Sequence, residues 1–166
     1  MKKPVIEFKD FSFRYKSQTE DTLKHINLTI YEGEKVLLLG PSGCGKSTLA
    51  HCINGLIPFS YDGECQGSCK NASLEVVQSS IFQLSNQVGT VLQDSDAQFV
   101  RLSVGEDIAY ALENENMPRE EMIPRVYQSA KMVDMHEFLN HVPYDLSGGQ
   151  KQRVALAGIM HDDVKI

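Results

Sequence analysis

The chain has 166 residues, of which 22 are Asp or Glu and 16 are Lys or Arg, so its formal net charge is −6. This length suits one domain with a sizeable core, and 42% hydrophobic with 23% charged residues is typical of an ordered globular protein. The acidic balance, with no run of Lys or Arg, excludes a basic face for nucleic acid. No segment has the ~18 consecutive apolar residues of a membrane span, and the first residues lead into a strand-like pattern rather than a signal peptide. We therefore expect any contact with a membrane to go through a partner.

Two half-buried strands are predicted near the N-terminus. Apolar residues recur at period two over residues 6–13, with a break near residues 9–10. After a polar turn the same alternation covers residues 26–30. The apolar positions concerned are Ile6, Phe8, Phe11, Phe13, Ile26, Leu28 and Ile30.

An uninterrupted apolar run follows at residues 35–39, which read Lys-Val-Leu-Leu-Leu. A strand that is apolar on both faces belongs in the middle of a parallel sheet. Residues 47–55 carry a helical pattern that stops at Gly55, a residue suited to a helix C-cap. Residues 60–93 are mixed polar with short β-like pieces, notably at residues 88–92.

Three helices are predicted in the second half of the chain. Ser103 and Glu106 have the spacing of a capping box and open the first. The second covers residues 125–133, and two prolines before it leave its start open. The third begins at Ser147 and runs toward Met160. The predicted apolar faces are Val104, Ile108, Ala111 and Leu112 on the first helix and Val126, Ala130 and Val133 on the second. Strands followed by helices predict a sheet-based core with a helical insert.

The four cysteines are predicted to be free thiols, because no signal peptide directs the chain to an oxidising compartment. Cys65 and Cys69 have a spacing that could supply half of a metal site. The sequence offers neither a second pair nor a nearby histidine to complete four ligands, so we predict no structural metal.

Residues 40–47, Gly-Pro-Ser-Gly-Cys-Gly-Lys-Ser, fit the pattern G-x-x-x-x-G-K-[ST] at every fixed position. Its glycines allow backbone N–H groups to turn inward and cradle phosphate oxygens, and the helix that follows adds its positive dipole end. In this pattern Lys46 reaches the β- and γ-phosphates and the Ser47 hydroxyl binds Mg²⁺. The pattern predicts a nucleotide phosphate site.

A second motif, Leu-Ser-Gly-Gly-Gln, occupies residues 146–150. Ser147 and Gln150 have capping-box spacing, but two glycines just inside the helix cost roughly 1 kcal/mol each relative to alanine. Such glycines are sensible where a ligand must approach the backbone closely. A helix N-terminus with a hydroxyl and little side-chain bulk predicts an anion site.

A phosphate loop followed by this motif resembles the ATP-binding cassette (ABC) ATPases, over the whole chain. The resemblance implies an α/β fold: a P-loop NTPase core with an antiparallel β subdomain and a helical subdomain, C-terminally truncated. It implies a nucleotide-binding, β-rich core at residues 1–93. Residues 94–150 would then hold the Q-loop and helical subdomain, and residues 146–160 the signature with its helix.

In that family two cassettes sandwich ATP head to tail, so the partners implied are a second ABC ATPase subunit and a transmembrane subunit. The implied cofactors are ATP and Mg²⁺. Tyr15 matches the aromatic residue that stacks on adenine, as an apolar ring face suits a base, and Gln93 matches the Q-loop glutamine that reaches the metal and the attacking water. The implied catalytic residues are Lys46 and Gln93, and the implied metal ligands Ser47 and Gln93. The implied nucleotide-binding residues are Tyr15, Gly40, Pro41, Ser42, Gly43, Cys44, Gly45, Lys46, Ser47, Thr48, Ser147, Gly148, Gly149 and Gln150.

The chain departs from the family pattern near its end. Family members continue from the signature helix into an apolar strand that ends in Asp-Glu and then to a switch histidine. No such strand precedes Asp162 and Asp163, and His161 comes too early to be the switch histidine. We expect an N-terminal piece of a cassette that binds ATP weakly without hydrolysing it. We also expect it to self-associate through residues 36–39 on an unprotected sheet edge.

Residues 94–109 are similar to the ATPase subunits of energy-coupling-factor importers, which take up vitamins and metal ions. This resemblance implies ATP hydrolysis that powers import of a small solute, at the cytoplasmic face of the cell membrane, with residues 94–108 as the contact surface for the membrane subunit. The alternative is a soluble ABC ATPase of the DNA-repair or translation type. The 98 residues between Ser47 and Leu146 carry no heptad run, which disfavours the repair type, and the signature disfavours a P-loop kinase.

Overall fold

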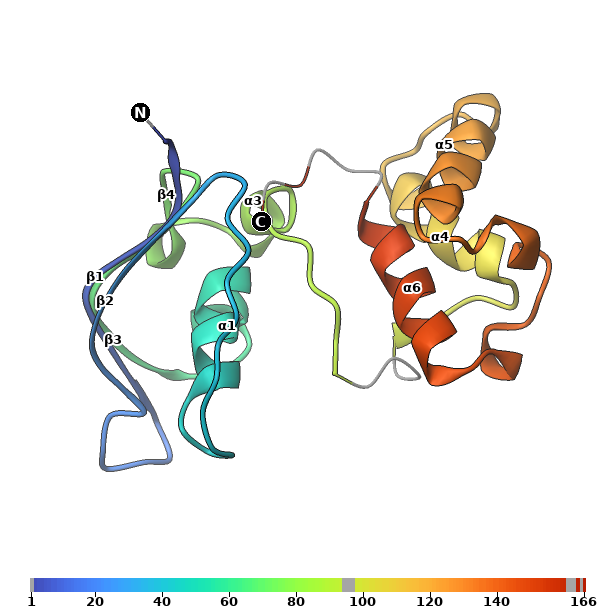
Figure 1. Ribbon diagram of the computed structural model, residues 1–166. Helices are drawn as coiled ribbons and strands as arrows, with labels where there is room; N and C mark the ends of the chain where they lie inside the picture. The colour runs from blue at the N-terminus through green and yellow to red at the C-terminus, as the bar shows by residue number, and fades with distance from the viewer. Residues whose placement is uncertain (1, 94–97, 161–163, 165) are drawn as a thin grey trace. The chain divides into compact units, whose positions relative to one another are not determined.

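The computed structural model describes residues 2–93, 98–160, 164 and 166, and it divides into two compact units. The first, here the β unit, is Met1–Gly89 with Lys165–Ile166. The second, here the helical unit, is Thr90–Val164. Figure 1 shows the described strands in the β unit and the longest helices in the helical unit.

An antiparallel sheet in the order β2-β1-β3-β4 forms the β unit. Its strands are β1 (Pro4–Tyr15), β2 (Leu23–Tyr31), β3 (Gly63–Asn71) and β4 (Leu74–Glu75). The two predicted N-terminal strands are confirmed as β1 and β2. The predicted break is a bulge, because the register shifts between Phe8 and Phe11 and Asp10 between them has a φ of +46°.

The core of the β unit lies between the sheet and helix α1 (Lys46–Asn54). Phe8, Phe11 and Phe13 of β1 are at most 2% exposed and pack in one cluster with α1 residues. As predicted, α1 ends at Gly55, whose φ is +81° and where a Cβ would lie 2.5 Å from a methyl group of Leu84. The remaining elements of this unit are α2 (Leu56–Phe59), η1 (Val76–Gln78) and α3 (Ile81–Ser85).

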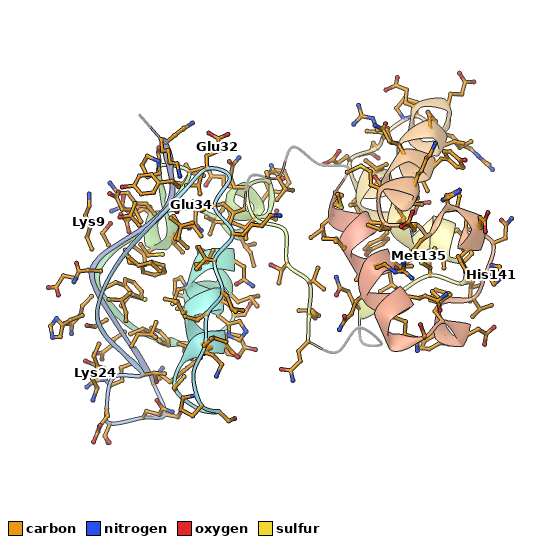
Figure 2. All side chains as sticks on the ribbon, viewed as in Figure 1. Lys9, Lys24, Glu32, Glu34, Met135 and His141 are labelled. Atoms are coloured by element: carbon orange, nitrogen blue, oxygen red, sulfur yellow. The ribbon has the colours of Figure 1, made fainter. Side chains whose placement is uncertain are left out.

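The prediction of a buried central strand at residues 35–39 is wrong. This segment is extended without strand pairing, and the side chains of residues 36–39 are 48–79% exposed. A strand that is apolar on both faces is stable between two neighbouring strands, and none of the described strands pairs with this segment. Figure 2 shows Glu32 and Glu34 at the turn before it, where the Glu34 carboxylate accepts the Tyr31 N–H at 3.0 Å and its pKa is thereby lowered.

The prediction of a strand at residues 88–92 is also wrong. The structure describes no strand at these residues. Among the described residues, the Gly89 N–H donates to the Ile166 carbonyl at 2.9 Å, and the Ile166 N–H donates to the carbonyl of the preceding Gln87 at 3.1 Å. By contrast, β3 lies within residues 60–93, where the sequence predicts short β-like pieces without bounds, because its sequence GECQGSCKN has no apolar alternation to define a strand. It is held by its pairing with β1 along most of its length.

The helical unit contains α4 (Val104–Asn114), α5 (Arg119–Met132), α6 (Gly148–Ile159) and the short turns η3 (His136–Phe138) and η4 (Pro143–Asp145). Both predicted capping boxes are confirmed, at Ser103 with Glu106 and at Ser147 with Gln150. The second helix starts at Arg119 rather than at residue 125. Pro118 is its N-cap, where a missing N–H costs no helical hydrogen bond, and the helix continues through Pro124.

The predicted apolar faces form the core of the helical unit. Val104, Ile108 and Leu112 of α4 pack with Val126 and Ala130 of α5 in a single buried cluster. Ala111 is only half-buried, and the neighbouring Ala109 lies in the core instead. Figure 2 shows Met135 among these helices, where it is fully buried. None of the described helices is long and apolar enough to cross a membrane.

Candidate functional site

The loop at residues 40–47 contains a turn that requires glycine. Gly43 and Gly45 have φ values of +81° and +93°. A Cβ on Gly45 would lie 3.1 Å from the side chain of Leu23 and 3.2 Å from the carbonyl oxygen of Thr22. Because the left-handed backbone already disfavours a side chain and the space is occupied, this position is restricted to glycine.

Helix α1 begins directly after this turn, with Gly45 as its N-cap. Gly45 has no side chain to accept the first-turn amides, so these donors and the positive dipole end remain available to an anion. The Lys46 ammonium lies over the loop and donates to the carbonyl oxygens of Gly40 and Pro41 at 2.8 and 2.7 Å. Ser47 is exposed in the first turn. Amides, a cation and a hydroxyl thus converge in an arrangement suited to phosphate.

Tyr15, the last residue of β1, is linked to the same helix. Its hydroxyl lies 3.0 Å from Oγ1 of the buried Thr48, two residues after Lys46. Its ring packs edge to face on Phe13, with centroids 4.8 Å apart. The fold therefore holds an aromatic ring beside the start of α1.

The thiols in the β unit differ in exposure. Cys44 in the loop is exposed, whereas Cys52 and Cys69 are buried. Burial raises the pKa of Cys52 to about 12 and raises that of Cys69 as well, so both remain protonated and unreactive at neutral pH. Within the described residues no group of three or more His, Cys, Asp or Glu side chains is arranged to hold a metal ion.

The other predicted site residues belong to the helical unit. Gln93 is exposed. The Ser147 hydroxyl accepts the Gln150 N–H at 3.4 Å, and the Gln150 side chain accepts the Ser147 N–H at 2.8 Å. A Cβ on Gly148 or Gly149 would find no atom within 4 Å. Nothing in the described part of this unit therefore requires glycine at either position.

The β unit thus brings Tyr15 together with the loop and Thr48, while Gln93 and residues 147–150 are positioned by the helical unit. Residues 94–97, part of the importer-like segment, and residues 161–163, discussed above for their departure from the family, lie outside the described residues.

One aromatic pair near Tyr15 was missed in the sequence. Tyr61 follows α2, and its ring stacks on that of His51 in α1, with centroids 4.8 Å apart and planes 8° from parallel. A sequence signal existed, because His51 is three residues after Thr48 and hence on the same side of α1.

Comparison with known proteins identifies the family. A family model described as ABC transporter matches residues 23–166. The chain belongs to the ABC transporter family. It is 57% identical over its whole length to an ABC transporter ATP-binding protein of Enterococcus faecalis, and 58% identical over 99% of its length to one of Clostridium perfringens. It spans 29% of the length of these curated relatives.

The solved structures agree with the predicted fold. The chain matches cbiO1 from Clostridium perfringens, part of the transporter complex cbiONQ, with a TM-score of 0.87 and 30% identity. That match covers 98% of this chain and 63% of cbiO1. A dimeric bacterial ABC transporter cassette matches with a TM-score of 0.79 and 30% identity, over 96% of this chain and 71% of the cassette. The ABC ATPase fold is confirmed.

Replacing Lys46 by alanine is expected to abolish nucleotide affinity and to leave the fold intact. The ammonium contacts only the exposed loop, so its loss opens no cavity in the core. Titration with a fluorescent nucleotide measures affinity, and circular dichroism measures the fold. Lys35→Ala, which removes an exposed lysine before the loop, is the control. Unchanged affinity in Lys46→Ala would disprove the phosphate-loop assignment.

Replacing Tyr15 by alanine is expected to weaken ATP binding by about 1–3 kcal/mol, the usual contribution of one base–aromatic stack. Tyr15→Phe keeps the ring and loses only the hydrogen bond to Thr48, so its affinity is expected to change little. Calorimetric titration of both variants provides the comparison. Equal losses in the two would point to a hydroxyl contact and would eliminate stacking.

Proposed function

We propose that this chain provides the ATP-binding region of an ABC transporter ATPase, which in the whole protein hydrolyses ATP to power import of a small solute. One observation carries the proposal: the Tyr15 ring is tied to Thr48, two residues beyond the lysine of the phosphate loop. The ring proposed to stack on a base and the loop proposed to bind phosphates are therefore both attached to helix α1. A related cassette whose structure holds ADP and phosphate supports this reading.

Residues of the phosphate loop in the β unit, and Gln93 of the helical unit, fit the cofactors expected for this family. First-turn amides and Lys46 would hold the nucleotide phosphates, and the exposed Ser47 hydroxyl with Gln93 would bind Mg²⁺. When bound, Mg²⁺ neutralises developing charge on the phosphates. Lys46 would stabilise the same charge, while Gln93 would orient the attacking water. We propose the remaining residues of the loop, with Thr48, as the other nucleotide contacts on this side.

The second half of the site is proposed to lie on another cassette. The signature residues Ser147, Gly148, Gly149 and Gln150 would contact the nucleotide bound to the phosphate loop of a partner arranged head to tail. The related cassette named above is dimeric. Because the chain covers 29% of its relatives and 63% of cbiO1, these relatives are more than twice as long as cbiO1. The partner cassette would thus fit within the same polypeptide.

A membrane subunit is the proposed partner of residues 94–108. In the described part of this segment, Val100 and Leu102 are 60% and 85% exposed. The loop that carries them is fixed, because the Asp107 carboxylate accepts the N–H groups of Val100 and Arg101 at 2.9 and 3.2 Å. An apolar surface held in place by a helix is suited to docking.

Through this partner the protein would lie at the cytoplasmic face of the cell membrane. The likeness to cbiO1, part of the transporter complex cbiONQ, supports a transporter as the wider assembly. The proposal of vitamins or metal ions as its solutes rests on the resemblance of residues 94–109 to energy-coupling-factor importers. The soluble alternative of the DNA-repair type is less well supported. The longest helix described, α5, has 14 residues, and the long coiled coil of repair proteins requires much longer helices.

Replacing Gly149 by alanine distinguishes the effect of this residue on helix stability from its proposed contact with the nucleotide on the partner cassette. The new methyl group meets no atom within 4 Å, and alanine favours a helix by up to about 1 kcal/mol, so the melting temperature is expected to rise. The methyl group would block the nucleotide on the partner cassette, so ATP-dependent association, measured by light scattering, is expected to be lost.

The matched control for that experiment is Gly158→Ala, in the same helix and equally free of neighbours. It is expected to raise the melting temperature and to keep ATP-dependent association. If Gly149→Ala associates like the control, the proposed role of the signature is wrong.

Replacing Leu102 by glutamate is expected to prevent co-purification with a co-expressed membrane subunit of an energy-coupling-factor importer. Because the side chain is exposed, the melting temperature is expected to change little. Met132→Glu, at an exposed apolar position of α5, is the control and is expected to retain the membrane subunit. Retention by both variants would remove this surface from the proposal.

A further inference from the structure

The segment after α2 is fixed beside Tyr15 by its backbone. The Lys16 N–H donates to the Asp62 carbonyl at 3.1 Å, and Gly63 pairs with Tyr15 in the sheet. The Tyr61 N–H donates to the Leu56 carbonyl at 3.0 Å. These bonds hold Tyr61 on both sides.

The close approach of this segment depends on glycine. A Cβ on Gly63 would lie 2.5 Å from the ring of Phe13 and closer still to the carbonyl oxygen of Arg14. Glycine at this position therefore lets β3 start against the ring pair of Phe13 and Tyr15. Its immediate predecessors, Tyr61 and Asp62, are thereby brought next to the proposed base platform.

The rings of Tyr15 and Tyr61 form a corner. Their centroids are 6.4 Å apart and their planes meet at 87°. The Tyr61 ring is supported by its parallel stack on His51. The Tyr15 ring, which packs on Phe13, is supported at its hydroxyl by Thr48. Both supports come from one side of α1. Partial burial lowers the pKa of His51, which keeps its imidazole neutral at pH 7 and favours stacking on an aromatic ring.

A groove of about 500 Å³ opens along this corner. It is lined by Tyr15, Lys16, Ser17, Ser60, Tyr61 and Asp62. Although Tyr61 is tethered at its backbone and stacked on one face, it remains 42% exposed. A ring fixed in this way without being buried is prepared for a ligand rather than used to fill a core.

We propose that Tyr61 forms the second wall of the base-binding groove. A base stacked on Tyr15 is then perpendicular to the Tyr61 ring and contacts it edge to face. His51 acts as a positioning residue that holds this wall. The inference rests on the proposed ATP binding and adds to it a base contact from a different part of the chain. The ligand class is the flat, heteroaromatic base of a nucleotide, since edge-to-face contact requires a π system.

The test compares ATP with tripolyphosphate, which carries three phosphates and no base, on the 166-residue chain. Tyr61→Leu is expected to weaken ATP binding about threefold to tenfold and to leave tripolyphosphate binding unchanged. Tyr61→Phe keeps the ring and is expected to bind both ligands like the wild type. Calorimetric titration measures the affinities of the wild type and of both variants for both ligands.

A double-mutant cycle tests the role of His51. His51→Ala is expected to weaken ATP binding less than Tyr61→Leu does, and to add little in the Tyr61→Leu background, because it acts through the same ring. Fully additive losses would overturn the positioning role.

The titrations distinguish failure of the proposed role of Tyr61 from failure of the proposed ATP binding. Wild-type affinity for ATP in Tyr61→Leu overturns the inference and leaves the proposed function in place. Loss of both ligands in Tyr61→Leu assigns Tyr61 a structural role and also overturns it. A wild-type chain that binds neither ligand removes the proposed function itself.

Discussion

The left-handed turn at Gly45 determines how α1 leaves the phosphate loop, and the part of the candidate site in the β unit depends on that direction. The turn is packed against Leu23 and Thr22, so the loop cannot shift without disturbing the start of β2. One side of α1 carries Leu49 and Cys52 into the core of the sheet. The residues at the N-terminal end of the same helix, Lys46 and Ser47, are instead the ones proposed to contact a ligand.

That single helix links three structures that are distant in the sequence. Lys46 reaches back over the loop, Thr48 holds the hydroxyl at the end of β1, and His51 holds the ring that follows α2. A change in the direction of α1 would move phosphate cradle and aromatic platform together. The positions of the phosphate loop, Tyr15 and Tyr61 therefore all depend on the turn at Gly45, whose φ is +93°.

Sequence reasoning succeeded where the determinants are local. The capping boxes at Ser103 and Ser147 depend on residues three positions apart, and the helix stop at Gly55 on one backbone conformation. It failed where pairing decides the structure. Residues 35–39 are apolar enough for a central strand, but among the described residues no neighbouring strand pairs with them. The reverse holds for β3, whose polar sequence becomes a strand because β1 lies beside it. Helical spacing places His51 on the same side of α1 as Thr48, but Tyr61 lies outside that helix, so its stack on His51 could not be predicted from the same pattern.

The glycines at the turns of the β unit and those at the start of α6 differ in what surrounds them. At Gly45, Gly55 and Gly63 a side chain would collide with neighbouring atoms, so the fold itself accounts for the residue. At Gly148 and Gly149 the space is open and the backbone is helical, so glycine costs helix stability and gains nothing within the unit. Gly158 of the same helix is equally open, so open space by itself assigns no role. For Gly148 and Gly149 we propose that the compensation comes from a nucleotide phosphate that approaches the amides at the start of α6. The capping box fixes Ser147 and Gln150 at the start of α6, and the two glycines between them carry no side chain. The backbone amides of this helix end are therefore accessible to an anion.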